Sequence, residues 1–348
     1  TVLTAKATVL DPADLNLVSN VVAKDQAIDV VLSPDGQYAY VSDFSFGLFI
    51  LDVSDSANPF EVGNLATGDG NTIDIDSSGD YVFTTSYKSG LLEVVDVRDN
   101  ANPTPVTNIA VGSDPGYLTL SSDDRYAFVP GGSEFTIVDV SNPASPSVTS
   151  NFALADGVHV ALSADGNVAY ITSRTLGLEI YDVSTPAAPS PLSNVAIPGA
   201  WAVTLSSDEQ YAFVGVDGSG LQVVDLTGVS PTIVANTTAA GNYLYDLELS
   251  NDGRYLFAVD AYGVNTFDVA DPTSPVALGN IALGSFGYSL AMSNNDQTVY
   301  VADLADVAIV SVGAETVIAG ISFGSTVDGG HTLTVNGSSL TFSGVGGG

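Results

Sequence analysis

Four acidic residues, Asp29, Asp74, Asp246 and Glu248, have the side-chain chemistry to bind a hard metal ion. Asp246 and Glu248 are two residues apart, so their side chains would point to the same face of a β-strand. Carboxylate oxygens are the ligands that Ca²⁺ prefers. The four residues are therefore a candidate calcium site. The alternative is that they are solvated polar residues in a water-filled channel.

His159 could act as a base or a metal ligand, but the chain has only one other histidine, His331. The usual zinc sites, with three histidines or with two histidines and a carboxylate, cannot be built around it. A structural or solvent-facing role is therefore expected for His159. The chain also has no cysteine and no motif for a nucleophilic serine, a phosphate loop or a dinucleotide. These absences favour a non-catalytic protein.

The elements that position these residues come from a repeat. The segment LSPDGQYAYV recurs in seven variants, whose starts are 42 to 45 residues apart. Each copy has an apolar run, a turn of the Ser-x-Asp-Gly type and an aromatic-rich β run, and a third and a weaker fourth strand follow. Four antiparallel strands in a repeat of this length are typical of a propeller blade. The sequence therefore predicts an all-β, seven-bladed β-propeller with four antiparallel strands per blade. The copies start at Leu32, Ile75, Leu120, Leu162, Leu205, Leu249 and Met292.

The seventh copy lacks a fourth strand, and the N-terminal segment LNLVSNVVA from Leu15 to Ala23 resembles the outer strand that precedes the other copies. We expect this segment to complete the last blade, because closing a ring removes exposed sheet edges. The predicted domains are an N-terminal β arm (1–14), the propeller (15–312) and a C-terminal β tail (313–348). The arm and the tail either pair with each other or add to a neighbouring subunit.

The innermost strand of each blade should line a central channel, with alternate side chains pointing into it. The candidate channel-lining residues are Thr72, Tyr117, His159 and Ser289, at positions equivalent to Asp29 and Asp246. These positions differ from blade to blade, as a ligand site requires. The neighbouring positions Trp201, Tyr245 and Tyr288 are expected to pack between blades instead.

The third-strand motifs, such as GLFILDV at Gly47 and GLEIYDV at Gly177, resemble the LVIVD repeat found in β-propeller regions of bacterial and archaeal surface proteins. The resemblance covers roughly residues 15–312. It implies the propeller fold and says little about function, because propellers carry many unrelated activities.

The net charge of -33, from 40 Asp and Glu against 7 Lys and Arg, argues against binding to nucleic acid or to anionic membranes. A cationic partner or a divalent metal such as Ca²⁺ fits this charge better. No apolar run is long enough to cross a bilayer. The acidic, cysteine-free composition favours an extracellular or cell-surface location, with any signal peptide already removed.

We therefore expect a non-catalytic structural or adhesive module that binds a protein or glycan at the cell surface. It could self-associate into a filament or surface layer through its terminal strands. The alternative is a calcium-dependent, lactonase-like propeller hydrolase that uses Asp29, Asp74, Asp246 and Glu248.

Overall fold

The computed structural model describes residues 2–3, 6–67, 69–237, 243–318, 321–322, 331–335 and 338–342. The chain divides into two compact units, one formed by residues 12–313 and the other by residues 1–11 together with 314–348. Across the described residues, no helix has the length and apolar character of a membrane span.

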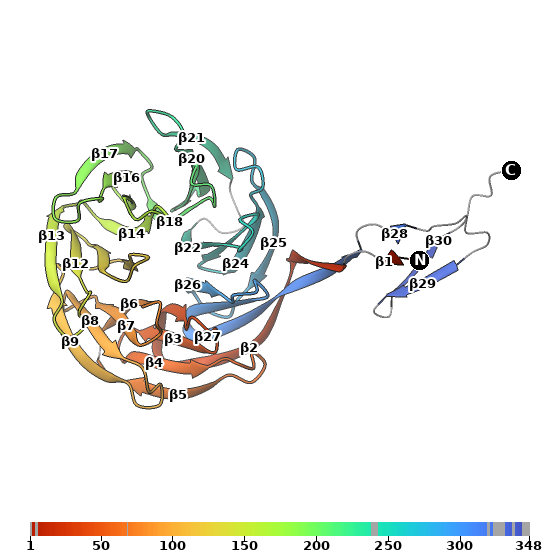
Figure 1. The fold of residues 1–348 in the computed structure, drawn as a ribbon, viewed down its shortest axis with the longest axis horizontal. Coiled ribbons are helices and arrows are strands. Elements are labelled where there is room, and N and C mark those ends of the chain that lie inside the picture. The colour runs from red at the N-terminus through yellow and green to blue at the C-terminus, as the bar shows by residue number, and fades with distance from the viewer. Residues whose placement is uncertain are drawn as a thin grey trace. The chain divides into compact units, whose positions relative to one another are not determined.

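The larger unit is a ring of antiparallel β-sheets (Figure 1). Five of its sheets have four strands each, which follow one another in chain order from the ring interior outwards. Their strands are β6 (Gly70–Ile75), β7 (Tyr81–Ser86), β8 (Leu91–Asp96) and β9 (Thr104–Ala110); β10 (Thr119–Leu120), β11 (Tyr126–Pro130), β12 (Glu134–Asp139) and β13 (Ser147–Ala153); β14 (Gly157–Leu162), β15 (Val168–Ser173), β16 (Gly177–Asp182) and β17 (Ser190–Val195); β18 (Ala200–Leu205), β19 (Tyr211–Val216), β20 (Gly220–Asp225) and β21 (Thr232–Thr237); β22 (Leu244–Leu249), β23 (Tyr255–Asp260), β24 (Gly263–Asp268) and β25 (Val276–Ala282).

The sixth sheet has six strands, so the prediction of seven separate four-stranded blades is wrong. The first and the seventh copies of the repeat share this sheet, because two of its strands run on without a break, β2 for 27 residues and β27 for 21. The strand order is β26-β27-β2-β3-β4-β5. The bounds are β26 (Gly287–Met292), β27 (Thr298–Ile318), β2 (Lys6–Leu32), β3 (Tyr38–Asp43), β4 (Gly47–Asp52) and β5 (Phe60–Leu65).

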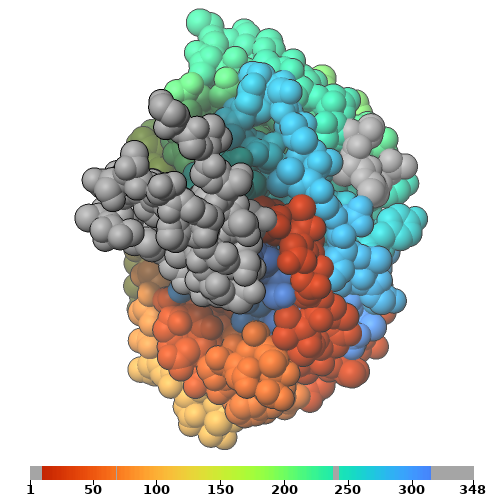
Figure 2. All heavy atoms as spheres, turned by 90° about the vertical axis from the view of Figure 1, so that its right-hand side faces the viewer, coloured from red at the N-terminus to blue at the C-terminus, as the bar shows by residue number. Residues whose placement is uncertain are grey.

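The predicted closure of the ring by the N-terminal segment is confirmed, since β2 is hydrogen-bonded to β27 in this sheet. Val21 and Ala23 of β2 pack against a buried cluster that contains Val307 and Ile309 of β27. Just before this segment, Ala13 lies beside Gly279 of β25, and the Thr266 hydroxyl of β24 donates a hydrogen bond to the Pro12 carbonyl at 2.8 Å. Figure 2 shows this part of the chain in red next to the light-blue segment.

The turn between the first two strands of a copy is fixed by its own side chains. In the first copy the Ser33 hydroxyl donates to the Asp35 carboxylate at 2.6 Å and accepts from the Tyr38 N–H at 2.9 Å. Gly36 has a φ of 69°, which a residue without a side chain adopts at little cost. Beyond the turns, aliphatic and aromatic side chains fill the space between neighbouring sheets. The repeat motif therefore encodes a hairpin and the face that packs against the next sheet.

In the smaller unit, β1 (Val2–Leu3) pairs antiparallel with β28 (Ile321–Ser322), so the two ends of the chain pair with each other. A second pair joins β29 (His331–Val335) and β30 (Ser338–Phe342). This agrees with the first of the two alternatives for the terminal segments. Much of the predicted tail, including 323–330 and 343–348, lies outside the described residues.

Candidate functional site: a pocket at one end of the central channel

All the innermost strands except the two-residue β10 carry one more residue than the strand beside them. In β2, Ala27 pairs with Asp43 and Asp29 with Ser42, so Ile28 has no partner across the ladder. The same β-bulge occurs in β14, β22 and β26, and register shifts at the same place in β6 and β18. A bulge re-aims the side chains around it. Simple alternation therefore does not tell which side chain faces the channel.

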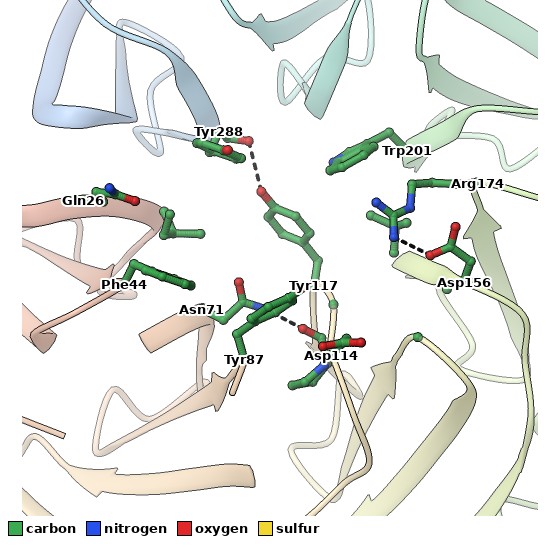
Figure 3. A pocket seen from close by; sticks show the side chains of 16 residues that line it. Gln26, Phe44, Asn71, Tyr87, Asp114, Tyr117, Asp156, Arg174, Trp201 and Tyr288 are labelled. Carbon is green, nitrogen blue, oxygen red and sulfur yellow. Dashed lines mark hydrogen bonds and ion pairs between the residues drawn. The ribbon is translucent and has the colours of Figure 1, made fainter. Parts of the chain in front are cut away.

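A cavity of about 440 Å³ lies where these bulges meet, and we call it the mouth pocket. Its walls come from the bulge positions and from the turns between the second and third strands of several copies. Figure 3 shows the side chains converging on this space from different sheets. The lining residues are Gln26, Ile28, Phe44, Asn71, Tyr87, Asp114, Pro115, Gly116, Tyr117, Gly132, Asp156, Gly157, Val158, Arg174, Trp201 and Tyr288.

The pocket wall is rich in aromatic rings. Trp201, the only tryptophan of the chain, and Tyr288 both line it. The Tyr245 ring lies 5.0 Å from the Trp201 ring and 5.6 Å from the Tyr288 ring. Phe44 and Tyr87 form another part of the wall, with ring centroids 6.2 Å apart. Such rings offer large, flat, apolar surfaces to a ligand.

Trp201 and Tyr288 pack against Tyr245 of the sheet between them, as predicted, and they also line the pocket, which was not predicted. Tyr288 is the extra residue between the paired residues Gly287 and Ser289, and the bulge turns it toward the pocket. Trp201 lies in the equivalent irregular stretch of β18. Its indole Nε1 is buried and has no hydrogen-bond partner in the described structure.

Tyr117 crosses the channel, as Figure 3 shows, and its hydroxyl donates to the Tyr288 carbonyl at 3.1 Å. The His159 ring lies 5.2 Å from the Tyr117 ring, and its Nε2 is 3.6 Å from Asp246 Oδ1. The other histidine nitrogen, Nδ1, is buried without a partner among the described residues. Of these two predicted channel residues, Tyr117 forms the floor of the pocket, and His159 packs against it outside the lining.

Asp29 and Asp246 are joined by the hydroxyl of Ser289. Ser289 Oγ lies 2.5 Å from Asp29 Oδ1 and 3.0 Å from Asp246 Oδ2, and all three residues are buried. The hydroxyl has one hydrogen and can donate it to only one carboxylate at a time. Burial, together with the nearby Asp246 charge, raises the pKa of Asp29 to about 7, although its hydrogen bonds act in the opposite direction. This group joins the first, sixth and seventh copies of the repeat.

The carboxylates of these inner strands also hold the next sheet. Asp29 accepts the Ile73 N–H at 2.9 Å, and Asp246 accepts the Leu290 N–H at 3.0 Å. Because each acceptor belongs to one sheet and each donor to the next, these bonds tie neighbouring sheets together around the channel.

Asp74 and Glu248 repeat this arrangement deeper in the ring. Asp74 accepts the Leu120 N–H at 2.9 Å, and Glu248 accepts the Met292 N–H at 2.8 Å. Burial raises the pKa of Asp74 to about 6 and that of Glu248 to about 8, the latter with help from the charge of Asp246. Thr72 has a similar role, since its hydroxyl donates to the Gly116 carbonyl of the next copy at 2.8 Å.

The four carboxylates predicted to bind calcium are not gathered into one set in the described structure. In the part of the chain that the structure describes, no three His, Cys, Asp or Glu side chains come together as a set that could hold one. Each of the four predicted ligands instead directs a carboxylate oxygen at a backbone N–H of the neighbouring sheet. A bound Ca²⁺ would need six to eight oxygens in one place.

The LVIVD repeat family matches this chain at residues 26–67, 69–111, 113–153, 157–196 and 199–243. A search among curated proteins gives no match. Among solved structures, the periplasmic gluconolactonase of Pseudomonas aeruginosa is similar, with a TM-score of 0.66, 16% sequence identity, and coverage of 81% of this chain and 88% of the other. At this identity the likeness shows the fold alone. The five family matches cover more than half of the sequence, and the chain belongs to the LVIVD repeat family of β-propellers.

Proposed function

We propose that this chain is a non-catalytic recognition module that binds its ligand in the mouth pocket. The observation that carries the proposal is the contrast between two sets of polar groups. The inner-strand carboxylates Asp29, Asp74, Asp246 and Glu248 are engaged with backbone amides of the next sheet. The pocket, in contrast, has aromatic walls and a buried indole N–H that lacks an acceptor.

These features suit recognition of a small group, such as part of a glycan or a short stretch of a protein. Ligand pockets typically combine apolar and aromatic walls with a few polar groups that fix orientation. Trp201 and the tyrosines supply the walls, while Asn71 and Asp114 supply polar atoms at the rim. A location outside the cytoplasm is part of the proposal. It is supported by the acidic composition and by the likeness to a periplasmic protein.

A glycan array and an array of short peptides, probed with the labelled full chain, test this function. We expect binding to a restricted set of spots, and the Trp201→Ala variant should lose it. Tyr262→Ala is the matched control, because Tyr262 is an aromatic residue, 69% exposed, that does not line the pocket. The proposal fails if no spot is bound, or if Trp201→Ala binds like the unaltered chain.

A second candidate function is a metal-dependent hydrolase of the lactonase type. It is favoured by the likeness to a gluconolactonase and by the acidic inner strands. Thermal melting with and without millimolar CaCl₂ separates the two candidates. We expect the same melting midpoint in both conditions, because the four carboxylates already accept backbone hydrogen bonds. A large Ca²⁺-induced rise that is lost in Asp246→Ala would favour the hydrolase instead.

A further inference from the structure

The charges around the mouth pocket are mostly negative. Asp114 and Asp156 line it, and Arg174 is the one Lys or Arg among the lining residues. Burial raises the pKa of Tyr117 well above its usual value, and the nearby charges of Asp29 and Asp246 beneath the floor add to this rise. The chain as a whole has a net charge of -33. A site with these surroundings attracts cations.

Two aromatic walls of the pocket already carry cations that belong to the chain itself. The guanidinium carbon of Arg174 lies 5.2 Å from the centre of the Trp201 ring, and Arg174 is ion-paired with Asp156 (Figure 3). The ammonium of Lys88 lies 4.4 Å from the centre of the Phe44 ring and 3.8 Å from Asp69. Both arrangements combine an aromatic face with a carboxylate, which is favourable cation–π geometry.

The pocket has further aromatic surface besides these two occupied faces. Tyr87 is 43% exposed, and Tyr117 and Tyr288 also line the cavity, whose volume is about 440 Å³. Arg174 is exposed and lies on the turn between β15 and β16, so its side chain can leave the Trp201 face without disturbing a strand.

We propose that the mouth pocket binds an organic cation, a guanidinium or ammonium group of the ligand, between its aromatic faces and the Asp114 and Asp156 carboxylates. This inference rests on the proposed function and specifies its ligand chemistry. In the free protein, Arg174 takes the position that the ligand cation would occupy over Trp201. An anionic group would instead be repelled by both carboxylates. An uncharged sugar could donate hydrogen bonds to them but would lack the attraction between opposite charges.

The fluorescence of Trp201, the only tryptophan, reports binding directly in the full chain. It is titrated with choline and with its uncharged analogue 3,3-dimethylbutan-1-ol. A second pair consists of a blocked Gly-Arg-Gly peptide and its citrulline counterpart, which lacks the charge. Ionic strength is held constant with NaCl. We expect saturable binding of at least one cation, about tenfold tighter than its uncharged analogue.

Three variants test the arrangement. Arg174→Gln should bind the cation several-fold more tightly, because it vacates the Trp201 face and frees Asp156. Asp156→Asn should bind it several-fold more weakly. Asp268→Asn is the matched control, since Asp268 pairs at 3.0 Å with Arg254, which lies 5.0 Å from the Tyr255 ring in a similar arrangement outside the pocket.

The outcomes are distinct. Tighter binding of choline than of the peptide assigns the cation to a free small molecule, and the reverse order assigns it to a protein side chain. Equal affinity for charged and uncharged analogues, no binding of either cation, or weaker binding by Arg174→Gln overturns the inference. If array binding still depends on Trp201 in those cases, the proposed recognition function stands without the cation.

Discussion

Two kinds of residue on the inner strands of this ring have different surroundings. The Asp246 carboxylate is fully engaged within the ring. It accepts the Leu247 N–H at 2.8 Å and the Leu290 N–H at 3.0 Å, and it lies 3.0 Å from the Ser289 hydroxyl. Tyr288, one position before Ser289, opens into the pocket instead. The comparison teaches that the carboxylates hold the sheets of the ring together, while the adjacent aromatic residues line the mouth pocket.

The largest expected effect is the loss of stability caused by replacing the hydrogen-bonded carboxylate Asp246. Asp246→Ala leaves the buried Leu290 N–H without an acceptor, and we expect a loss of about 3 kcal/mol in the free energy of unfolding. Trp201→Ala should cost clearly less, because that ring is only partly buried. Urea unfolding at pH 7 measures both values. A larger loss in the free energy of unfolding for Trp201→Ala than for Asp246→Ala would contradict the comparison.

The next effect is a pH dependence at Asp29. Its pKa rises from 3.8 to about 7 on folding, so the folded state holds this proton more tightly than the unfolded state does. Stability from this group is complete below about pH 4 and is lost as the pH rises through 7. Between pH 5 and pH 8 it should account for a fall of about 2 to 3 kcal/mol.

Asp29→Asn removes that proton while keeping the shape of the side chain. Urea unfolding at pH 5 and pH 8 should therefore show a smaller fall in stability for the variant than for the unaltered chain. Some fall should remain, because the pKa values of Asp74 and Glu248 are raised as well. An identical fall in both proteins would mean that Asp29 is ionised across this range.

The smallest effect is expected for Tyr117, whose ring lines the pocket and whose hydroxyl is hydrogen-bonded to the Tyr288 carbonyl. Tyr117→Phe loses the hydrogen bond to the Tyr288 carbonyl, and we expect a cost of about 1 kcal/mol. The ring remains in place, so cation binding in the pocket should change little. A loss of several kcal/mol in urea unfolding would show that the hydroxyl has a larger part in holding the floor.

Much of the fold follows from the sequence, because the repeat is regular. The turn residues Ser33, Asp35 and Gly36 fix the hairpin through contacts within a few residues, so their pattern is sufficient to predict it. The pairing of the N-terminal segment with the last copy was also predictable from its likeness to other outer strands. The number of sheets was not, because β2 and β27 join elements that look separate in the sequence.

The candidate site was less predictable, for a local reason. The prediction assumed regular alternation along the inner strands, which a bulge breaks by one residue. Nothing in the sequence around Tyr288 distinguishes the extra residue from its neighbours. The carboxylate positions were identified, but their hydrogen-bond partners lie about 44 residues away on the next sheet, and spacing alone could not show that backbone N–H groups would be there.

The bulge has a consequence for how such a ring can change. Its extra residue makes no ladder pair, so replacing that residue disturbs neither the strand register nor the bonds between sheets. The side chains at positions 28, 158, 201 and 288, which line the pocket, can therefore be changed while the strand pairing is kept. Protein engineering could therefore change the shape and polarity of the pocket by single substitutions at these positions, while the β-sheets beneath it stay the same.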